Sequence, residues 1–473
     1  MKKTLSLIMI LFLAIQIHAE TIEKTYFFND FQVRATKGNY YMIDADGALN
    51  TAVIGQPLLP WFAANFVLPP GEEIASVEFI GNDMVTISGS YQLMPKQYAQ
   101  PISKGKSGQF AKDEGIYQSN DAYPLIGNQT NNTQFWAGHG IGTVHYTPFV
   151  YHAKSGEINY YRQVTLVIKT KSTEKAQAAL QLLNSTNNLL VSEFIENPES
   201  LKLYPQMASS KSTDYDYLII TPEEFVSEFD GLVYHYLIRG MKTIVKSKEE
   251  ILAEMDGQDA QEKIRNYIIQ EYTANNVTYV MLGGDVEHIP YRGFYCSVQS
   301  SSVYEDDNIP SDLYYSALDG NWNTDGDGKW GEIGEDDLLP EVAVARFSFS
   351  NTTELASMLN KTTNYQSNPV LGNLAHPMMA GEHLYDNPIT WGSDYLELMI
   401  GYQDENGYET TGIPEDNTFT KLYDEETTWS STDLTNEINQ GKNFVHHVGH
   451  ANENTVMKYY TSDITNSAFS GAN

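Results

Sequence analysis

The pattern of apolar and polar positions divides the chain into two parts. From residue 21 to about 175, apolar and polar residues alternate in short runs such as 76–80, 84–88 and 163–171. A two-residue period of this kind is typical of half-buried strands, and loops rich in Gly, Asn, Lys and Ser separate the runs. The pattern predicts a β-rich, sandwich-like domain over residues 20–210, ending in a polar linker.

From residue 214 on, strand patterns and helix patterns alternate. The apolar run 215–220 precedes a helix start with a proline at its first position, and the amphipathic stretch 259–272 precedes a second apolar run. This order predicts a parallel sheet flanked by helices and joined by right-handed crossovers. We expect an α/β region of two subdomains, 214–370 and 371–473, the second of them incomplete.

The first residues have the pattern of an export signal. The basic pair Lys2 and Lys3 precedes an apolar run at 5–17, and Ala19 offers a small residue for cleavage. These features predict a signal peptide over residues 1–19, with a buried first helix as the alternative. The run is too short for a comfortable membrane span and no later stretch matches it. The mature chain is therefore expected to be secreted or held at the cell surface, without a membrane span.

The composition excludes several classes of protein. Hydrophobic residues make up 41% of the chain, which rules out wholesale disorder. Lys and Arg number 29 against 61 Asp and Glu, so the net charge of −32 argues against nucleic acid or an anionic membrane as partner. Such an acidic surface tolerates calcium and attracts cationic substrates. The single cysteine, Cys296, excludes a disulfide scaffold and a multi-cysteine zinc site.

His450 is the first candidate for chemistry. It follows the apolar run 443–448 and Gly449, and catalytic groups gather beyond the carboxyl ends of strands in an open parallel sheet. An imidazole suits general acid–base catalysis there, although an ordinary loop histidine fits the same position. His446 lies four residues earlier, which on a strand is about 13 Å away, so the two histidines are not expected to share a zinc ion.

A second candidate is an acidic loop in the middle of the chain. Side-chain oxygens recur there at the spacing of a calcium-binding loop, at Asn321, Asn323, Asp325, Asp327 and Glu332. A bound calcium ion would make the loop rigid, whereas a solvated turn explains the same residues without an ion. Asp319 or the acidic run 335–337 could add charge. Structural calcium is the one cofactor expected, and no organic cofactor is.

Two carboxylates and one thiol complete the candidates. Glu382 follows the apolar run 377–380, and Asp394 stands at the start of a predicted helix. Asp394 either caps that helix or offers an anion to a basic substrate side chain. Cys296 has no helix start beside it and one nearby cation, so it is not expected to be a nucleophile. The serine-hydrolase motif Gly-x-Ser-x-Gly is missing from the sequence.

Taken together, these residues resemble the gingipain family of secreted cysteine peptidases. The similar segments are 279–290, 311–315, 344–347, 380–382, 391–394 and 448–450. The stretches 55–60 and 68–71 are similar to the family's N-terminal propeptide, so that the resemblance covers nearly all of the mature chain. It implies a caspase-like α/β catalytic domain of two subdomains, preceded by a propeptide domain over residues 20–210.

The resemblance also implies roles for individual residues. His450 matches the catalytic histidine, Glu382 the carboxylate that orients it, and the amide of Ala451 one donor to the oxyanion. Asp394, with Trp391 in the same motif, matches the pocket for a basic side chain at P1. The sequence has Ala451 where the family often shows glycine.

The family's catalytic cysteine follows the histidine after the next strand, and none of the residues after His450 is a cysteine. We expect a truncated chain rather than a dead homologue, so the polypeptide as printed is expected to be inactive. The complete protein is expected to be a zymogen whose His–Cys dyad forms a thioester with protein or peptide substrates. Its propeptide is the other expected partner.

Two other functions fit the same sequence. A surface-anchoring transpeptidase would use the same thioester but pass the acyl group to an amine instead of water. A non-catalytic surface adhesion or binding protein on a degenerate peptidase scaffold is the alternative from a different class. Neither the acidic loop at 319–337 nor the aromatic content of the chain separates these alternatives from the peptidase.

Overall fold

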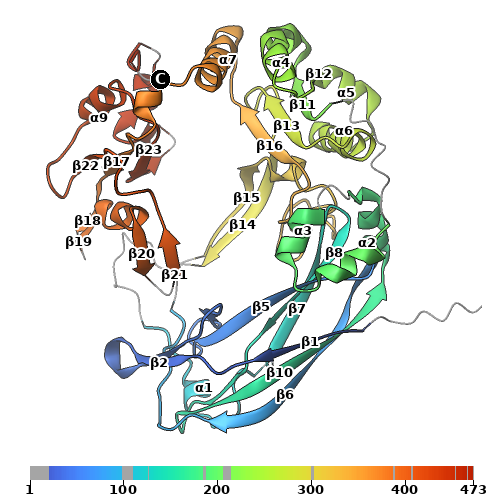
Figure 1. The fold of residues 1–473 in the computed structure, drawn as a ribbon, viewed down its shortest axis with the longest axis vertical. Helices are drawn as coiled ribbons and strands as arrows, with labels where there is room; N and C mark the ends of the chain where they lie inside the picture. The colour runs from blue at the N-terminus through green and yellow to red at the C-terminus, as the bar shows by residue number, and fades with distance from the viewer. Residues whose placement is uncertain are drawn as a thin grey trace, which may run out of the picture.

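The computed structural model describes residues 21–97, 110–125, 127–184, 188–205, 215–299, 303–386, 389–405, 408–452, 454–465 and 467–471. The predicted signal peptide at 1–19 and the linker around 207–213 lie outside these residues. The described chain forms a β-rich part, an α/β part and a smaller C-terminal α/β part (Figure 1). Within it, no helix is both long enough and apolar enough to cross a membrane.

The β-rich part contains two antiparallel sheets. The first has the order β1 (Thr21–Phe27), β10 (Glu157–Ser172), β6 (Glu72–Thr86), with β9 (Phe149–His152) also paired to β10. The second has the order β4 (Leu49–Thr51), β5 (Leu59–Val67), β8 (His139–Tyr146), β7 (Gln129–Trp136). A separate pair joins β2 (Gln32–Ala35) to β3 (Tyr41–Asp44).

The two sheets pack face to face through the apolar side chains that alternate along their strands. Phe66 of β5, Val144 of β8 and Leu166 of β10 belong to one fully buried cluster. Strand β10 shows the alternation expected of a strand with one face in a core. Three short helices, α1 (Glu114–Tyr117), α2 (Glu174–Ala179) and α3 (Asn188–Phe194), accompany the sheets.

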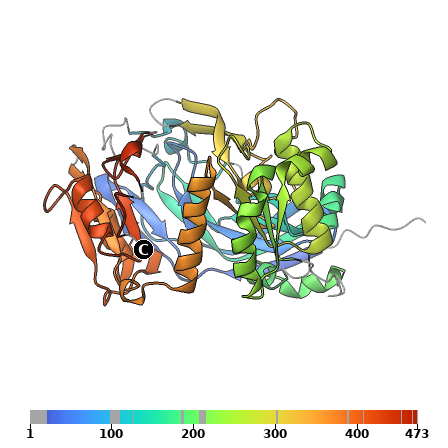
Figure 2. The same ribbon diagram turned by 90° about the horizontal axis from the view of Figure 1, so that it is seen from above.

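The central part is a parallel sheet with helices on both faces (Figures 1 and 2). Its order is β12 (Thr243–Ser247), β11 (Tyr217–Thr221), β13 (Tyr279–Gly283), β16 (Ala343–Phe347). Its helices are α4 (Asp230–Leu237), α5 (Lys248–Glu254), α6 (Ala260–Asn275) and α7 (Thr352–Ser367). An exposed ribbon, β14 (Arg292–Gln299) with β15 (Val303–Ser311), follows β13.

Alternate residues of the central strand β11 point into two different cores. Leu218 packs with Ile264 and other side chains of α6, whereas Ile219 packs with Phe229 and Leu355 on the opposite face. Every residue of β11 is buried, as expected of a strand covered on both sides. The central sheet therefore has one apolar core on each face, where side chains of its strands pack against the helices that cover that face.

The C-terminal part repeats this plan on a smaller scale. Its parallel sheet has the order β22 (Thr420–Tyr423), β17 (Met378–Gly381), β23 (Val445–Val448). The helix α9 (Ser431–Ile438) packs on the face that includes Met378, and α8 (Ser393–Leu396) packs on the face of Met379. In the part of the chain that the structure describes, this sheet and the central sheet are separate and α7 leads from one to the other.

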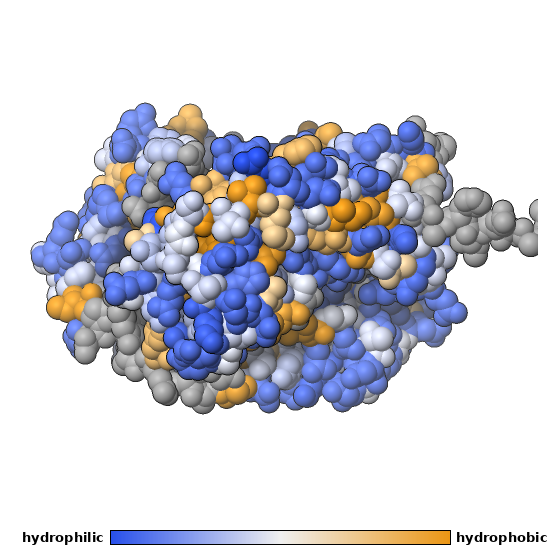
Figure 3. Space-filling model, turned by 90° about the horizontal axis from the view of Figure 1, so that it is seen from below, coloured by the Kyte–Doolittle hydropathy of each residue, from blue (hydrophilic) through white to orange (hydrophobic). Residues whose placement is uncertain are grey.

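The C-terminal part also contains short antiparallel strands outside its parallel sheet. They are β18 (His383–Asp386) with β19 (Ile389–Trp391), β20 (Tyr402–Glu405) with β21 (Tyr408–Thr411), and β24 (Ala451–Asn452) with β25 (Thr455–Val456) and β26 (Tyr459–Tyr460). Figure 3 shows a face of the molecule on which hydrophilic residues predominate and hydrophobic ones form separate patches, in keeping with the acidic composition.

Candidate active site

The candidate site lies at the carboxyl edge of the C-terminal sheet. Gly381, the last residue of β17, pairs with Tyr423 of β22 on one side and with Val448 of β23 on the other. Since the three strands are parallel, the residues that follow them emerge at the same edge. Glu382 follows β17, and His450 follows β23 after Gly449.

The His450 imidazole is held by a backbone carbonyl. Its Nε2 lies 2.9 Å from the carbonyl oxygen of Leu384, in the hairpin β18–β19. A carbonyl oxygen only accepts, so Nε2 carries the proton and Nδ1 carries the lone pair in this arrangement. The residue is exposed, and the ring of Tyr385 meets it edge-on at 5.5 Å between centroids. The hydrogen bond thus fixes one tautomer of an exposed histidine, with the lone pair on Nδ1.

Glu382 is paired with a different histidine from the one expected. Its Oε1 lies 2.8 Å from Nε2 of His447, and its Oε2 accepts a 3.3 Å hydrogen bond from the backbone N–H of His450. The expectation that this carboxylate orients the His450 imidazole is therefore corrected: it contacts the backbone of His450 and not its ring. The reason is register, because His447 pairs with Ala380, two residues before Glu382 on the same face.

The Glu382 carboxyl is held in its charged form. Burial alone would raise its pKa, but the hydrogen bonds from His447 and from the His450 amide outweigh burial and hold the pKa below its usual value. The side chains of Glu382 and His447 are each only 9% exposed. The pair is therefore a largely buried, charge-assisted contact at the base of the His450 loop.

A second carboxylate joins the surrounding loops. Asp424, directly after β22, lies 2.7 and 2.9 Å from the Nζ of Lys458 and accepts backbone N–H groups of His383 and Trp429. Burial would raise the pKa of Asp424, but the hydrogen bonds from Lys458 and the two amides lower it overall. Lys458 has the left-handed φ of 61°. No sequence pattern predicts a role for either Asp424 or Lys458.

Glycines in the three site motifs allow the backbone to pack closely. A Cβ at Gly392 would lie 2.3 Å from the carbonyl oxygen of Val448, and one at Gly381 would lie 2.7 Å from the amide nitrogen of Ser393. A Cβ at Gly449 would lie 2.2 Å from Nε2 of His447. These separations are shorter than any real contact, so each motif requires glycine for space.

The remaining residues of the expected substrate site lie nearby on the chain. Ala451 is exposed and opens β24 directly after His450. Asp394 is exposed in the first turn of α8, where its Oδ2 accepts a 3.1 Å hydrogen bond from the backbone N–H of Trp391. The N-cap of α8 is Gly392 and no side chain caps this helix, so the capping role considered for Asp394 is not what the structure has: Asp394 bonds a backbone N–H that precedes the helix. The ring of Trp391 packs against His383, with centroids 4.7 Å apart.

The acidic loop brings together part of the expected calcium set. Carboxylate oxygens of Asp325, Asp327 and Glu332 lie within 4.8 Å of one another. The side-chain oxygen of Asn323 is buried and has no hydrogen-bond partner, whereas that of Asn321 accepts from the Asn323 amide and from Thr324. Three carboxylates this close together suit a hard cation, and the Asn321 side chain is used within the loop instead.

A second carboxylate cluster lies deeper in the molecule. Asp319, Asp337 and Glu341 have oxygens within 4.8 Å of one another, beside the buried Arg265. Burial raises the pKa of all three carboxyls, that of Glu341 to about 8. Their positions show that Asp319 and Asp337 belong to this cluster and not to the set around Asp325.

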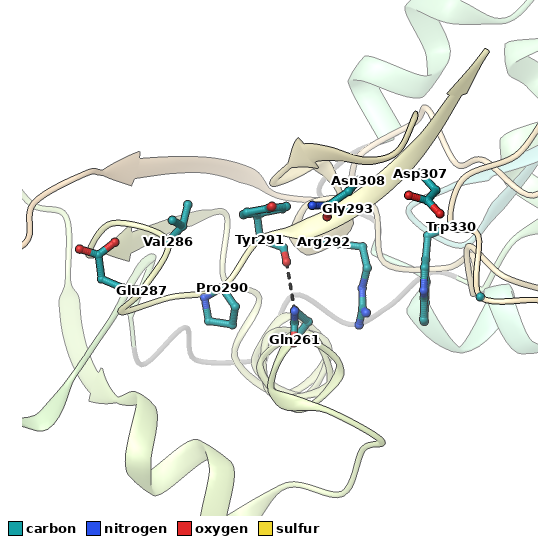
Figure 4. Close-up of a pocket in the computed structure, with 11 residues that line it drawn as sticks. Gln261, Val286, Glu287, Pro290, Tyr291, Arg292, Gly293, Asp307, Asn308 and Trp330 are labelled. Carbon is teal, nitrogen blue, oxygen red and sulfur yellow. Dashed lines mark hydrogen bonds between the residues drawn. The ribbon is translucent and has the colours of Figure 1, made fainter. Parts of the chain in front are cut away.

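A cavity of about 480 Å³ lies at the foot of the ribbon β14–β15 (Figure 4). Gln261, Arg292 and Trp330 are among its lining residues, and His450 is not. In the close-up, the side chain of Gln261 donates to the carbonyl of Tyr291. Cys296 is exposed on the same ribbon, opposite Asp306, and so lies on a different sheet from β23, the strand that precedes His450.

A protein-family model that covers the α/β parts of the chain places the molecule in a family of peptidases. Residues 210–471, more than half of the chain, match the model of peptidase family C25. The chain belongs to peptidase family C25. The resemblance to gingipains predicted from the sequence motifs is confirmed by this match and by the relatives that follow.

Two of the similar curated proteins are gingipains of Porphyromonas gingivalis. Gingipain R2 of strain W83 is 23% identical over 232 residues, covering 48% of this chain and 27% of the relative. Gingipain R1 is 22% identical over 350 residues, covering 71% of this chain and 31% of the relative. The chain thus spans less than a third of the length of these relatives.

Two solved structures are also similar to parts of the chain. The crystal structure of the Arg-specific cysteine proteinase gingipain R matches with a TM-score of 0.38 and 19% identity, over 55% of this chain and 52% of that chain. A complex of gingipain pro- and mature domains from Porphyromonas gingivalis matches with a TM-score of 0.31 and 12% identity, over 39% of this chain and 95% of that chain.

Proposed function

We propose that the full-length protein is a secreted cysteine endopeptidase of gingipain type in which His450 is the general base. The observation that carries this proposal is the geometry of its ring. The carbonyl of Leu384 accepts a hydrogen bond from the Nε2–H, so Nδ1 of an exposed residue remains as the base at the carboxyl edge of a parallel sheet. Family C25 membership supplies the reaction class.

The proposed reaction begins with transfer of a thiol proton to Nδ1 of His450. The thiolate attacks the scissile carbonyl carbon, the amine leaves with the proton from His450, and water then hydrolyses the thioester. The N–H of Ala451 is proposed to donate to the oxyanion, a contact worth about 3 kcal/mol. The nucleophile is a thiol other than Cys296, which lies on the ribbon β14–β15.

The proposed substrates are proteins or peptides with a basic residue at P1. The net charge of −32 favours approach of cationic chains. Asp394 is exposed beside Trp391, and its second carboxylate oxygen is available in addition to the one that accepts the Trp391 amide. We propose that this oxygen receives the positive charge at P1.

The N-terminal residues are proposed to direct export and latency. In this proposal, residues 1–19 are the signal peptide and residues 20–210 are an inhibitory or chaperoning propeptide domain. Support comes from a contact between the β-rich part and the α/β part, where Trp136 donates to the carbonyl of Pro340 and the Ala137 amide donates to Glu341. Release of the domain is proposed to occur within the polar stretch that ends at residue 213.

We also propose structural calcium at the acidic loop. Asp325, Asp327 and Glu332 would hold the ion with the buried side-chain oxygen of Asn323, and Asn321 would not take part. When bound, the ion neutralises the carboxylates and makes the loop rigid. The ion has no role in the proposed peptide cleavage.

The decisive experiment is hydrolysis of arginyl and lysyl peptide substrates by the full-length protein. Replacing the general base, His450→Ala, is expected to lower kcat by about 100-fold or more. The matched control is His446→Ala, which removes an imidazole from the same strand and should retain activity. Undiminished activity of the His450→Ala protein would overturn the assignment. Transfer of the acyl group to an added amine instead of water would identify a transpeptidase.

A further inference from the structure

The carboxylate of Glu382 joins two successive parts of the chain at the end of β23. One oxygen takes the 2.8 Å contact with the His447 ring, and the other takes the backbone N–H of His450 at 3.3 Å. A carboxylate with one partner could rotate away from the second. With the ring of His447 fixed on Oε1, Oε2 stays directed at the amide of His450.

The position of the His447 ring is itself restricted. The indole of Trp429 meets it at right angles, with centroids 6.3 Å apart, and donates its own N–H to the carbonyl of Gly381 at 3.0 Å. On the other side, the backbone of Gly449 leaves no room for a Cβ, which would lie 2.2 Å from His447 Nε2. The ring is therefore packed between an indole and the loop that carries His450.

The contact is too well buried to be a surface ion pair. Each side chain of the pair is 9% exposed, so water competes little for either partner. A carboxylate at such a site needs donors on both oxygens, because an unsatisfied buried charge is costly. Removing the His447 ring would leave Oε1 without that donor and would free the carboxylate to turn.

We infer that His447 is a positioning residue, which acts through Glu382 to hold the backbone of His450 in the place that its ring needs for proton transfer. The inference rests on the proposed role of His450 as general base. In it, the orientation of the His450 ring has two supports. The carbonyl of Leu384 sets the ring and its tautomer, and the His447–Glu382 pair sets the backbone beneath it.

The test compares three substitutions in the full-length protein. His447→Ala removes the donor to Glu382, and His447→Gln replaces it with an amide N–H at a similar reach. His446→Ala is the matched control, because successive side chains of a strand point to opposite faces and His446 lies on the other face of β23. Steady-state kinetics on one peptide substrate gives kcat and KM for each variant.

We expect His447→Ala to lower kcat by about tenfold or more with KM unchanged, since a displacement of about 1 Å at a reacting group can cost about a hundredfold. His447→Gln should recover most of the loss, and His446→Ala should match the parent. A parent-like kcat in His447→Ala overturns the inference. Equal losses in His447→Ala and His447→Gln, in step with a lower Tm, also overturn it by showing a merely structural role.

A second measurement is independent of turnover. Nitrogen NMR shifts of the His450 ring should show the Nε2–H tautomer in the parent and in His447→Gln, and a mixture of tautomers in His447→Ala. An unchanged tautomer in His447→Ala contradicts the inference. Failure of the proposed function is distinguishable, because it would appear as full activity in His450→Ala, whatever happens at His447.

Discussion

Gly449 is the residue on which the packing of the site depends most directly. A Cβ at this position would lie 2.2 Å from Nε2 of His447 and 2.5 Å from Cδ of Glu382. Its backbone is outside the left-handed region, so space and not conformation requires the glycine. Any side chain at residue 449 must push the carboxylate and the imidazole apart.

Gly449→Ala is therefore expected to destabilise the protein by about 1–3 kcal/mol, as overpacking of a tight site does. The expected loss of kcat follows from displacement of the same carboxylate. Gly231→Ala is the control: this glycine lies in α4 with open space around it, and the alanine should stabilise by about 0.5–1 kcal/mol. Urea unfolding of both variants checks the pair, and equal effects would contradict the steric argument.

For single residues, the sequence predicts where the site residues lie on the sheet better than it predicts which residues they contact. The placement of Glu382 and His450 at strand ends follows from the rule for parallel sheets, and both residues lie there. The partner of Glu382 depends on the register of β17 against β23, which aligns Ala380 with His447. The pattern of apolar and polar residues does not predict that register. Lys458 contacts Asp424 because its own backbone is left-handed. Such a turn is usually predicted from a glycine, and residue 458 is a lysine.

Among the elements, helix α6 is tied to the root of the ribbon β14–β15 by one carboxylate. Asp259 caps the helix by accepting the Glu262 amide at 2.8 Å, and both its oxygens accept from Arg292 at 2.9 Å. The guanidinium of Arg292 stacks on the ring of Trp330, 3.8 Å from its centroid. The cap and the ion pair thus share one oxygen, Oδ1.

Two substitutions separate the cap from the ion pair. Asp259→Asn keeps a capping oxygen and loses the charge, whereas Asp259→Ala loses both and should cost about 1 kcal/mol more. Burial raises the pKa of Asp259, but the bonds from Arg292 and the helix amides lower it overall. The stability from this charge is therefore present above about pH 4 and is lost as pH falls through the lower native pKa.

Urea unfolding at pH 6 and pH 3 tests this prediction. The advantage of the parent over Asp259→Asn should be largest at pH 6 and smaller at pH 3, which lies below the pKa of the carboxyl in the unfolded chain. A difference in unfolding free energy between the parent and Asp259→Asn that does not change with pH would contradict a contribution from the charge.

The acidic loop gives a prediction for calcium. If the ion binds at Asp325, Asp327 and Glu332, a calcium concentration 100 times Kd should stabilise the protein by about 2.7 kcal/mol. The double change Asp325→Asn with Asp327→Asn should abolish the increase in Tm. The exposed Glu224→Gln is the charge-matched control and should retain it. Calorimetric titration checks the same variants, and an undiminished response in the double variant would exclude this site.

The sequence pattern predicts the strands and helices better than it predicts the contacts within the loops. The long period-two run around β10 and the amphipathic helix α6 are where the pattern placed them, because tertiary packing agrees with local preference there. The spacing of the loop 321–332 suggests one role, calcium binding or a solvated turn, for all its side-chain oxygens, and the structure divides them. Asn321 accepts from the loop's own donors, a choice that depends on loop closure and not on spacing.

For the whole molecule, the buried cluster of Asp319, Asp337 and Glu341 connects the α/β part to the β-rich part. The Glu341 carboxylate accepts the backbone N–H of Ala137 at 2.9 Å. Burial raises the pKa of Glu341 to about 8, and burial with the nearby Asp337 raises that of Asp319. Since the folded state binds protons that the unfolded chain releases above about pH 4, stability should fall as pH rises toward 8.

The expected effect is a Tm that decreases between pH 5 and pH 8 in the presence of a chelator. Asp319→Asn should flatten the decrease, because the amide donates a hydrogen bond to Asp337 at every pH, as the protonated carboxyl does only at low pH. Asp416→Asn, at an exposed site, should keep the slope of the parent. Calorimetry at both pH values gives the comparison, and an unchanged slope in Asp319→Asn would contradict the assignment.

The hydrogen bond between Ala137 and Glu341 spans 204 positions of the chain. A ribosome adding about 5–20 residues per second needs about 10–40 s to cover that interval. During those seconds the β-rich part can fold while its Ala137 amide is still bonded to water, and the newly made acceptor arrives at a surface already formed. The β-rich part is thus made before the acceptor that it contacts, and separating the two parts afterwards returns that amide to solvent.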